Sequence, residues 1–322
     1  MDNSQMIGIV LAAGKGTRMK SEQPKVLHEV FFAPMVHHVL DALSPLGLMQ
    51  TIVVTGHMHA LVEKALARYK TAFVFQEKQL GTGHAVISCR ELLTAYHGSV
   101  LIVCGDTPLL RTETLSDFVD KHRRSGSQIT IMTTVVNDPT HYGRILSDAQ
   151  GKVRAIVEEK DADPEQKKIC EINAGIYCVE ADLLFSVLQR VGCNNKQGEL
   201  YLTDIVGIAT GDGIAVHKYL CPDHNEILGV NSRWELAQAH QALQQRHLQH
   251  LMDSGVTILQ PDNVSIAKTV TIGRDSVIHP FVSLTGHTEL GRSVTVESFV
   301  YIKDCRVADG CTVTAFSDLR PA

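Results

Sequence analysis

A glycine-rich segment that directly follows an apolar run has the composition of a phosphate-binding loop. Residues 11–19 read Leu-Ala-Ala-Gly-Lys-Gly-Thr-Arg-Met. Two glycines one residue apart allow backbone N–H groups to approach a phosphate closely, and Lys15 and Arg18 add positive charge. The segment completes neither a G-x-G-x-x-G fingerprint nor a P-loop, so a purely structural glycine turn is the alternative. Lys25 favours a polyphosphate site, because it places another cation a few residues further on.

A carboxylate follows a second apolar run. Residues 100–104 are apolar and lead into Gly-Asp-Thr-Pro-Leu at 105–109. Asp106 is therefore expected at the carboxyl end of a core strand, the edge at which open α/β sheets bind ligands. One Asp with a few neutral oxygens suits Mg²⁺, which keeps several waters and shares phosphate oxygens. The alternative is that Asp106 only caps the turn after the strand.

Short apolar runs alternate with helical patterns from Met6 to about Leu220. Runs rich in β-branched residues predict buried strands at 7–11, 51–55, 72–75 and 100–104. Between them, one helical pattern starts at Pro34 and carries Val36, Val39, Leu40 and Leu43. Another places Leu61, Ala65, Leu66 and Tyr69 on one face. This β-α-β order predicts an α/β fold with a doubly wound, Rossmann-like sheet.

A long polar helix is predicted after Asn231. Ser232 and Glu235 have the spacing of a capping box, and a Gln- and His-rich pattern without glycine or proline runs on towards Asp253. Gly255 is expected to end the helix. A helix of this length and polarity suits a connector between domains.

Beyond this helix, aliphatic residues recur at every sixth position, which predicts a hexapeptide-repeat β-helix. The ladder consists of Ile266, Ile272, Ile278, Leu284, Leu290, Val296 and Ile302, and its frame then moves by one residue to Val307, Val313 and Leu319. A second ladder two residues earlier is interrupted by Ser276 and Thr288. Ordinary β-hairpins, the alternative, would alternate at every second residue with irregularly spaced turns.

Composition excludes several classes of protein. The 322 residues carry a formal charge of -5, whereas proteins that bind nucleic acid or membrane surfaces are normally basic. No apolar run approaches the roughly 18 residues of a membrane span, so we expect no nucleic-acid partner and no stable membrane association. The eight cysteines form no C-x-x-C pair, which favours reduced thiols and a cytoplasmic location.

A series of motifs in fixed order connects these features. They are L-A-A-G-K-G-T-R-M at 11–19, P-K-V-L-H at 24–28, Q-L-G-T-G-H-A at 79–85, G-D-T-P-L at 105–109, Y-G-R-I at 142–145, I-V-E-E-K-D at 156–161, E-I-N-A-G-I at 171–176, G-E-L-Y-L-T-D at 198–204 and G-V-N-S-R at 229–233. Over nearly its whole length the sequence resembles the sugar-nucleotide pyrophosphorylases. Within them it is most similar to the uridyltransferase half of bifunctional N-acetylglucosamine-1-phosphate uridyltransferase/glucosamine-1-phosphate acetyltransferase.

The resemblance implies Mg²⁺-dependent transfer of UMP from UTP to N-acetylglucosamine 1-phosphate. The products are UDP-N-acetylglucosamine, for cell-envelope precursors, and pyrophosphate, and no covalent enzyme intermediate forms. By the family pattern, Arg18, Lys25 and Asp106 are catalytic. Asp106 and Asn231 bind Mg²⁺. The substrate contacts it implies are Leu11, Ala12, Ala13, Gly14, Gln76, Gly81 and Thr82 for uridine, Gly143, Glu158 and Asn173 for the sugar, and Lys25, Cys104, Gly105, Asp106 and Asn231 elsewhere.

The resemblance also predicts the domain organisation. A nucleotidyltransferase domain at 1–231 is followed by a connecting helix at 232–254 and a short left-handed parallel β-helix at 255–322. The family's β-helices associate as trimers, so we expect a homotrimer. Its acetyltransferase site lies beyond an F-x-x-L-R-P segment, here at 316–321, so we expect no acetyltransferase activity. Cys104 and Ala174 depart from the residues expected in relatives, which leaves sugar selectivity open.

Two alternatives remain beside the uridyltransferase. One keeps the fold and the mechanism but uses glucose 1-phosphate or dTTP. The other is a non-catalytic scaffold that binds nucleotide sugars, for which losses at the cationic or metal positions would be expected. A dehydrogenase is disfavoured, because the third glycine and an acidic residue at the end of the second strand are both missing.

Overall fold

The chain divides into two compact units. The computed structural model describes residue 3 and residues 5–321. The first unit contains the described residues up to His28 together with Pro34–Ser232, and the second contains Glu29–Ala33 and the residues from Arg233 onwards. A short stretch early in the sequence therefore belongs to the unit that is otherwise formed by the C-terminal third of the chain.

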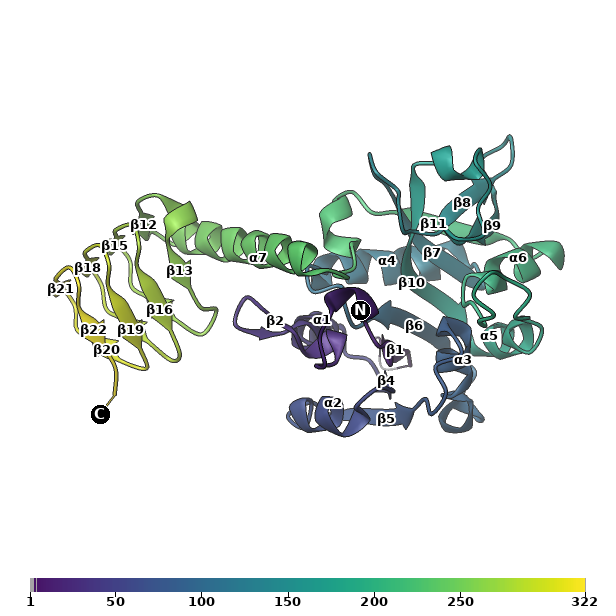
Figure 1. The fold of residues 1–322 in the computed structure, drawn as a ribbon, viewed down its shortest axis with the longest axis horizontal. Coiled ribbons are helices and arrows are strands. Elements are labelled where there is room, and N and C mark those ends of the chain that lie inside the picture. The colour runs from purple at the N-terminus through teal and green to yellow at the C-terminus, as the bar shows by residue number, and fades with distance from the viewer. Residues whose placement is uncertain (1–2, 4, 322) are drawn as a thin grey trace. The chain divides into compact units, whose positions relative to one another are not determined.

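The first unit is built on a mixed sheet, to which nine of the described strands contribute. Seven of them follow the order β11-β7-β10-β6-β1-β4-β5 (Figure 1). The strands are β1 (Ile7–Ala12), β4 (Gln50–Thr55), β5 (Thr71–Phe75), β6 (Ser99–Cys104), β7 (Ile129–Val135), β8 (Arg144–Ser147), β9 (Val153–Val157), β10 (Glu171–Glu180) and β11 (Val216–Leu220). The four strands predicted from apolar runs are confirmed as β1, β4, β5 and β6.

Strand direction is partly as the β-α-β order predicted. Strand β1 is parallel to β4 and β6, and β4 is parallel to β5. Strand β10 is antiparallel to both of its long neighbours, β6 and β7, so the sheet is mixed. The β8–β9 hairpin joins the sheet through β10, where Ile172 pairs with Arg144.

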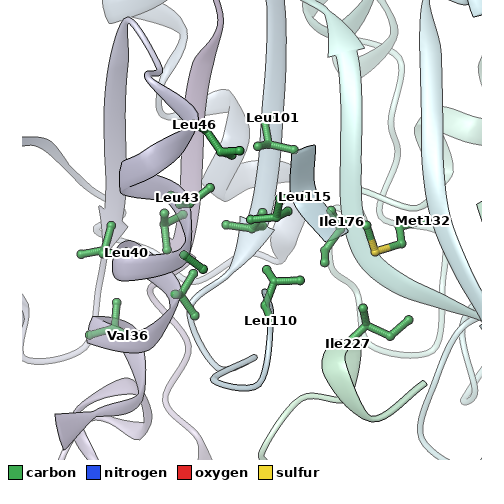
Figure 2. Packing of buried hydrophobic residues seen from close by; sticks show 14 of the residues in the cluster. Val36, Leu40, Leu43, Leu46, Leu101, Leu110, Leu115, Met132, Ile176 and Ile227 are labelled. Atoms are coloured by element: carbon green, nitrogen blue, oxygen red, sulfur yellow. The ribbon is translucent and has the colours of Figure 1, made fainter. Parts of the chain in front are cut away.

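Helices cover both faces of this sheet. They are α1 (Met35–Leu43), α2 (His59–Ala65), α3 (Thr82–Ile87), α4 (Thr112–Ser125), α5 (Ala181–Leu188) and α6 (Asp204–Gly211). Because side chains alternate along a strand, Val10 of β1 packs with α1, α2 and α4, while Ile9 packs with α3, α5 and α6. Figure 2 shows part of the first of these layers, in which Leu40 and Leu43 of α1 belong to one cluster with Leu101 of β6 and Leu115 of α4.

The two early helices test the predicted apolar faces. Helix α1 follows Pro34 as predicted, and its four predicted face residues are buried. For α2 the predicted face is wrong at Leu61, which is 45% exposed, whereas Val62 is fully buried. Helix α2 begins after Met58, whose φ is 53°, and Val62 and Leu66, four residues apart, are both fully buried.

The second unit consists of a helix and a series of very short parallel strands. Helix α7 (Arg233–Asp253) has close to the bounds predicted for the connector. The strands form three sheets in the orders β12-β15-β18-β21, β13-β16-β19-β22 and β14-β17-β20. Their bounds are β12 (Thr257–Ile258), β13 (Ser265–Ile266), β14 (Thr271–Ile272), β15 (Val277–Ile278), β16 (Ser283–Thr285), β17 (Glu289–Leu290), β18 (Thr295–Val296), β19 (Tyr301–Lys303), β20 (Arg306–Val307), β21 (Thr312–Val313) and β22 (Asp318–Leu319).

The pairing of these strands is consistent with a parallel β-helix. Each strand pairs with the third strand after it, so that Ile266 lies beside Leu284 and Leu284 beside Ile302. Leu290 then pairs with Val307, which is the predicted shift of the frame by one residue. Six of the seven residues of the first ladder are buried and Ile272 is partly buried.

The polar interruptions of the second ladder are also buried, and each hydroxyl has a partner. The Ser276 hydroxyl donates to the carbonyl of Gly291 at 3.0 Å and accepts from the Val294 backbone N–H at 3.1 Å. Thr288 donates to the carbonyl of Thr285 at 2.8 Å. Both residues are fully buried. At Ser276 the hydroxyl satisfies two backbone groups that an aliphatic side chain would leave without a partner.

A hairpin of β2 (Glu29–Val30) and β3 (Ala33–Pro34) carries two aromatic residues in its turn. Phe31 and Phe32 have φ values of 45° and 63°, in the left-handed region that costs a non-glycine residue roughly 1–2 kcal/mol. Phe31 is only 4% exposed. Its backbone N–H donates to Nδ1 of His240 in α7 at 3.1 Å, and its ring lies 5.6 Å from that of His247. Packing on α7 therefore offsets the backbone cost.

None of the described helices is both long and apolar enough to cross a membrane.

Candidate active site

The candidate site lies at the edge where four parallel strands of the first unit end. Leu11 of β1 is in register with Cys104 of β6, and Ala12 is in register with Thr55 of β4. The backbone N–H of Gly105 donates to the carbonyl of Leu11 at 2.9 Å. The loops that follow β1 and β6 therefore begin side by side, as expected for the ligand-binding edge of an α/β sheet.

The glycine-rich loop and the lysine segment pack against each other through Gly16. Gly16 has a φ of 61°, and a Cβ atom at this position would lie 2.5 Å from Cβ of Lys25. Any side chain at residue 16 would displace Lys25. Lys25 starts a single turn of 3-10 helix, η2 (Lys25–Leu27), whose other residues Val26 and Leu27 are buried. The backbone of Lys25 and the base of its side chain are thus held from two sides.

A cavity of about 660 Å³ opens between these loops and α3. It brings together ten of the residues predicted to contact substrate, which are Leu11, Ala12, Ala13, Gly14, Lys25, Gln76, Gly81, Thr82, Cys104 and Asp106. Lys15 and Gly16 of the predicted phosphate-binding loop also line it. The lining residues that were not predicted are Val26, Glu77, Lys78, Gln79, Ala85 and Glu199. The cavity is large enough for a nucleotide.

On the side of the cavity near α3, hydrogen bonds and close packing hold Gln76, Gly81 and Thr82 in place. Gln76, which is 3% exposed, donates from Nε2 to the carbonyl of Gly81 at 3.1 Å and lies 3.0 Å from Nδ1 of His84. A Cβ atom at Gly81, where φ is 107°, would lie 2.5 Å from the carbonyl oxygen of Leu200. The Thr82 hydroxyl accepts from the backbone N–H of Leu202 at 3.0 Å. Residues 199–202 therefore form a second wall behind α3.

Asp106, Asn231 and Lys25 converge although they are far apart in the sequence. The Lys25 ammonium forms an ion pair with Oδ2 of Asp106 and donates to Oδ1 of Asn231 at 2.6 Å. The turn after β6 is closed by Thr107, whose hydroxyl donates to the carbonyl of Cys104 at 2.9 Å. Asp106 is therefore not needed to cap that turn, and its carboxylate faces the cavity.

The oxygens that hold this ammonium have the chemistry of a magnesium site. A carboxylate and an amide oxygen point at one positive charge, and both are hard oxygen donors of the kind that Mg²⁺ takes. No group of three or more His, Cys, Asp or Glu side chains that could hold a metal occurs among the described residues. Two protein ligands therefore fit a cation that completes its shell with phosphate oxygens and water.

A buried carboxylate anchors the segment that carries Asn231. Glu226 of η6 (His224–Ile227) is 1% exposed, and it accepts hydrogen bonds from Arg111 and from the hydroxyl of Thr114 at 2.5 Å. Ile227 beside it enters the core layer drawn in Figure 2. The backbone N–H of Val230 then donates to the carbonyl of Asp106 at 2.8 Å, which places Asn231 next to Asp106.

The three residues predicted to bind the sugar are neighbours in the structure. Asn173 donates from its backbone to the carbonyl of Gly143 at 2.9 Å. A Cβ atom at Gly143 would lie 3.7 Å from both Cβ of Asn173 and Cδ of Glu158. The amide nitrogen of Asn173 donates to the hydroxyl of the buried Tyr177 at 2.7 Å. From the sequence, these three residues could be assigned to one site only through the resemblance to a family.

Burial is the main influence on Glu158. Its pKa is raised first by burial and further by Asp204 and Asp161, while a hydrogen bond from the Thr203 hydroxyl at 3.0 Å acts in the opposite direction. The adjacent Glu159 has a different partner, the buried Arg144, at 2.5 Å. The two neighbouring glutamates therefore face different partners.

Cys104 lies between the two groups of predicted ligands. Its thiol donates to the carbonyl of Gly175 at 3.6 Å. Burial, with Asp106 nearby, raises its pKa to about 12. The thiol is therefore protonated at neutral pH and is no nucleophile. Gly105 supports the strand end and is not among the residues that line the cavity.

Arg18 does not line the cavity that Lys25 and Asp106 line. It is exposed, and it lines a separate cavity of about 360 Å³ together with Glu158 and Tyr201. The structure therefore places Arg18 in one cavity with Glu158, one of the three predicted sugar residues, and it places Lys25 with the predicted metal ligands.

Three supporting residues were missed by sequence reasoning. Thr203, Tyr177 and Glu226 each hold a predicted site residue or its segment through a hydrogen bond or a buried ion pair. Thr203 belongs to the G-E-L-Y-L-T-D motif, so that motif could have directed attention to it. Tyr177 and Glu226 are polar residues in largely apolar surroundings and gave no local signal.

Comparison with known proteins agrees with this geometry. The nucleotidyl transferase family model matches residues 7–235. Bifunctional protein GlmU of Desulfotalea psychrophila is 46% identical, over 97% of this chain and 92% of the relative. Bifunctional protein GlmU of Heliobacterium modesticaldum is 44% identical, over 97% of this chain and 72% of the relative. The chain belongs to the GlmU family of nucleotidyl transferases.

Membership of the GlmU family makes the chain a nucleotidyltransferase, a UDP-N-acetylglucosamine diphosphorylase that serves cell-wall precursor synthesis. The GlmU fold also resembles a more distant solved structure. A Bacillus anthracis protein described as a glucose-1-phosphate thymidylyltransferase and solved with sucrose is 20% identical, with a TM-score of 0.58 over 74% of this chain and 94% of that one. At this identity the likeness concerns the fold alone.

Proposed function

We propose that this enzyme transfers UMP from UTP to N-acetylglucosamine 1-phosphate in a Mg²⁺-dependent reaction that releases pyrophosphate. The observation that carries the proposal is the convergence of Lys25, Asp106 and Asn231. Lys25 and Asp106 line the same cavity as the glycine-rich loop. This cluster supplies a cation and two hard oxygen ligands beside backbone N–H groups suited to a polyphosphate.

The nucleotide is bound along the 660 Å³ cavity. Leu11 to Gly14, Gln76, Gly81 and Thr82 hold the uridine, and the hydrogen bonds that fix Gln76 and Gly81 keep that wall in place before the ligand arrives. Lys15 and Lys25 face the triphosphate. A preorganised wall of this kind reduces the entropy that binding would otherwise cost.

The sugar phosphate is held by Gly143, Glu158 and Asn173. Thr203 and Tyr177 orient the last two side chains. Arg18, which shares a cavity with Glu158, neutralises the phosphate of the incoming sugar. That phosphate is already ionised at neutral pH, so it attacks the α-phosphorus of UTP directly and no general base is required.

The protein's own contribution is position and charge. Holding nucleophile and α-phosphorus in line makes the reaction effectively unimolecular, and fixed cations stabilise the charge that develops on the phosphate oxygens. Asp106 and Asn231 would hold Mg²⁺, which supplies Lewis-acid stabilisation of those oxygens when bound. Cys104 takes no covalent part, because its thiol is protonated.

For the second unit we propose a left-handed β-helix that assembles a homotrimer. The division of the chain into a catalytic domain at 1–231, a connecting helix at 232–254 and a β-helix at 255–322 is part of the same proposal. Light scattering coupled to gel filtration measures the assembly, and a monomeric mass at micromolar concentration would contradict it.

The decisive experiment is pyrophosphate release from UTP with N-acetylglucosamine 1-phosphate, with and without Mg²⁺, run beside glucose 1-phosphate. We expect strong Mg²⁺-dependent release with the N-acetylated sugar and little with glucose 1-phosphate. A preference for glucose 1-phosphate would retain the fold and mechanism but overturn the substrate. No release with either sugar would favour the non-catalytic scaffold.

A further inference from the structure

The Lys25 ammonium lies between the two side chains that are proposed to bind the metal. We propose that this ammonium is an internal counter-ion for Asp106 and Asn231, which a divalent cation displaces, so that metal binding releases Lys25 towards the triphosphate. The inference rests on the proposed metal role of Asp106 and Asn231, and it adds an exchange between two cations at one pair of oxygens.

The contacts are those of a cation held in a defined place. The Lys25 ammonium pairs with Oδ2 of Asp106 and donates to Oδ1 of Asn231 at 2.6 Å. The side chains of Lys25 and Asp106 are only 13% and 19% exposed. A carboxylate this shielded from water is costly without a positive partner, and Lys25 supplies that partner.

The surroundings limit where the ammonium can go. The stem of Lys25 lies against Gly16, where any Cβ atom would come within 2.5 Å of Cβ of Lys25. Asp106 and Asn231 are joined through the backbone bond from Val230 to the Asp106 carbonyl, at 2.8 Å. The Asp106 and Asn231 oxygens therefore form one preorganised cation site, whereas the end of the long lysine side chain can move.

The ammonium and a metal ion cannot occupy this oxygen site at the same time. The same Asp106 and Asn231 oxygens that hold the ammonium are the protein ligands proposed for the metal, so the two positive charges compete for them. A displaced ammonium remains in the cavity that Gly14 and Lys15 also line. Lys25 would therefore have two successive roles. Without metal it pairs with the Asp106 and Asn231 oxygens, and with metal bound it contacts the triphosphate.

The test measures metal binding without nucleotide. Mn²⁺ is titrated into the 322-residue protein, and free Mn²⁺ is followed by electron paramagnetic resonance. Wild type is compared with Lys25→Met, which keeps the aliphatic stem and removes the ammonium. We expect Lys25→Met to bind one Mn²⁺ about tenfold more tightly, since a hydrogen-bonded charge no longer has to be displaced. In the same variant, UTP alone should bind more weakly than in wild type.

Lys15→Met is the matched control. Lys15 lines the same cavity, but in the described part of the chain it has no hydrogen bond or ion pair with Asp106 or Asn231. Its loss removes an equal charge from the same surroundings, so a general electrostatic effect would strengthen Mn²⁺ binding in both variants alike. If Lys25→Met does not fold, Lys25→Gln removes the charge and keeps an amide donor for Asp106.

The outcomes separate this inference from the proposed function. Tighter Mn²⁺ binding in Lys25→Met but not in Lys15→Met, lost again when Asp106→Asn is added, supports the exchange. Equal Mn²⁺ affinity in wild type and Lys25→Met, with turnover still dependent on Mg²⁺, overturns the exchange and leaves the metal role intact. If no protein binds Mn²⁺ and turnover needs no divalent cation, both the exchange and the metal role are wrong.

Discussion

Lys25 and Asp106 are the residues whose loss should be most visible in turnover. We expect Lys25→Ala or Asp106→Ala to slow turnover by about 10²- to 10³-fold, the effect typical of removing one preorganised electrostatic contact. The measurement is kcat for pyrophosphate release at saturating substrates, with the thermal unfolding midpoint recorded for each variant. A folded variant that turns over like wild type would refute the proposed role of that residue.

Glu158 couples function to stability through its raised pKa. Burial favours the protonated acid in the folded protein. Stability from this preference is complete below the ordinary carboxyl value of 4.5 and is lost as pH rises through the higher pKa of the folded state. Glu158→Gln should therefore be more stable than wild type at pH 7.5, with the difference vanishing near pH 4.

The same substitution should weaken the sugar site. Because the carboxylate is proposed to contact the sugar, we expect Glu158→Gln to raise KM for N-acetylglucosamine 1-phosphate by about tenfold, the value of one hydrogen bond to a charged group. Urea unfolding at the two pH values and KM for each substrate are the measurements. Lower stability of Glu158→Gln at pH 7.5 would contradict the argument from burial.

At the scale of elements, the short helix η6 depends on one buried carboxylate. Removing Arg111 leaves Glu226, which is 1% exposed, without its cation, so we expect Arg111→Ala to lower the free energy of unfolding by about 3 kcal/mol. Turnover should fall as well, because η6 leads to Asn231. Urea unfolding and kcat measure the two effects.

A second arginine provides the control for this experiment. The pair Arg190–Asp212 lies at the surface, with the two side chains 55% and 36% exposed. Exposed pairs contribute little to stability, so Arg190→Ala should change unfolding and turnover far less than Arg111→Ala. Equal effects of the two substitutions would mean that Glu226 does not anchor η6.

Among the short parallel strands of the second unit, the polar residue that interrupts the second apolar ladder at Ser276 is stabilising. Completing the apolar ladder with Ser276→Val would leave the Gly291 carbonyl and the Val294 N–H without the hydroxyl that now bonds both. We expect the substitution to destabilise the protein by about 1–3 kcal/mol. Denaturant unfolding followed by circular dichroism measures the change, and a stabilised Ser276→Val protein would refute this explanation.

Elements with local signals could be predicted, and those defined by distant contacts could not. Strands β1, β4, β5 and β6 are buried on both faces and therefore appear as continuous apolar runs. The hexapeptide ladder is visible because one face repeats at a fixed interval. The antiparallel direction of β10 has no local signature, since apolar composition does not encode strand direction. Leu61 was assigned to the core face of α2 because it and the buried Val62 are adjacent apolar residues, and the sequence does not show which of the two packs on the core.

The candidate site shows the same limit. Asp106 and the glycine-rich loop could be located from strand ends and glycine spacing alone. Gly143, Glu158, Asn173 and Asn231 could be named only through resemblance to a family, because they come together by folding. Arg18 and Lys25 appeared equivalent as nearby cations, and only the structure assigns them to different cavities.

At the scale of the whole molecule, the spatial units do not follow the linear sequence. The chain leaves the first unit after His28, returns at Pro34 and leaves again after Ser232. A polar helix begins at the last of these points, at Arg233, and its composition marks that point in the sequence. The earlier excursion is too short to show as a change in composition, so it could be recognised only from the packing of Phe31 on α7.

This excursion decides how a minimal catalytic fragment should be made. A fragment that ends at Ser232 would keep the β2–β3 hairpin but lose α7. The apolar ring of Phe31 would then be exposed to solvent, which favours aggregation. Replacing Phe31-Phe32 by Asn-Gly, which suits two successive left-handed residues, should leave that fragment more soluble than one with the natural turn. Sedimentation of the two fragments after equal expression compares them.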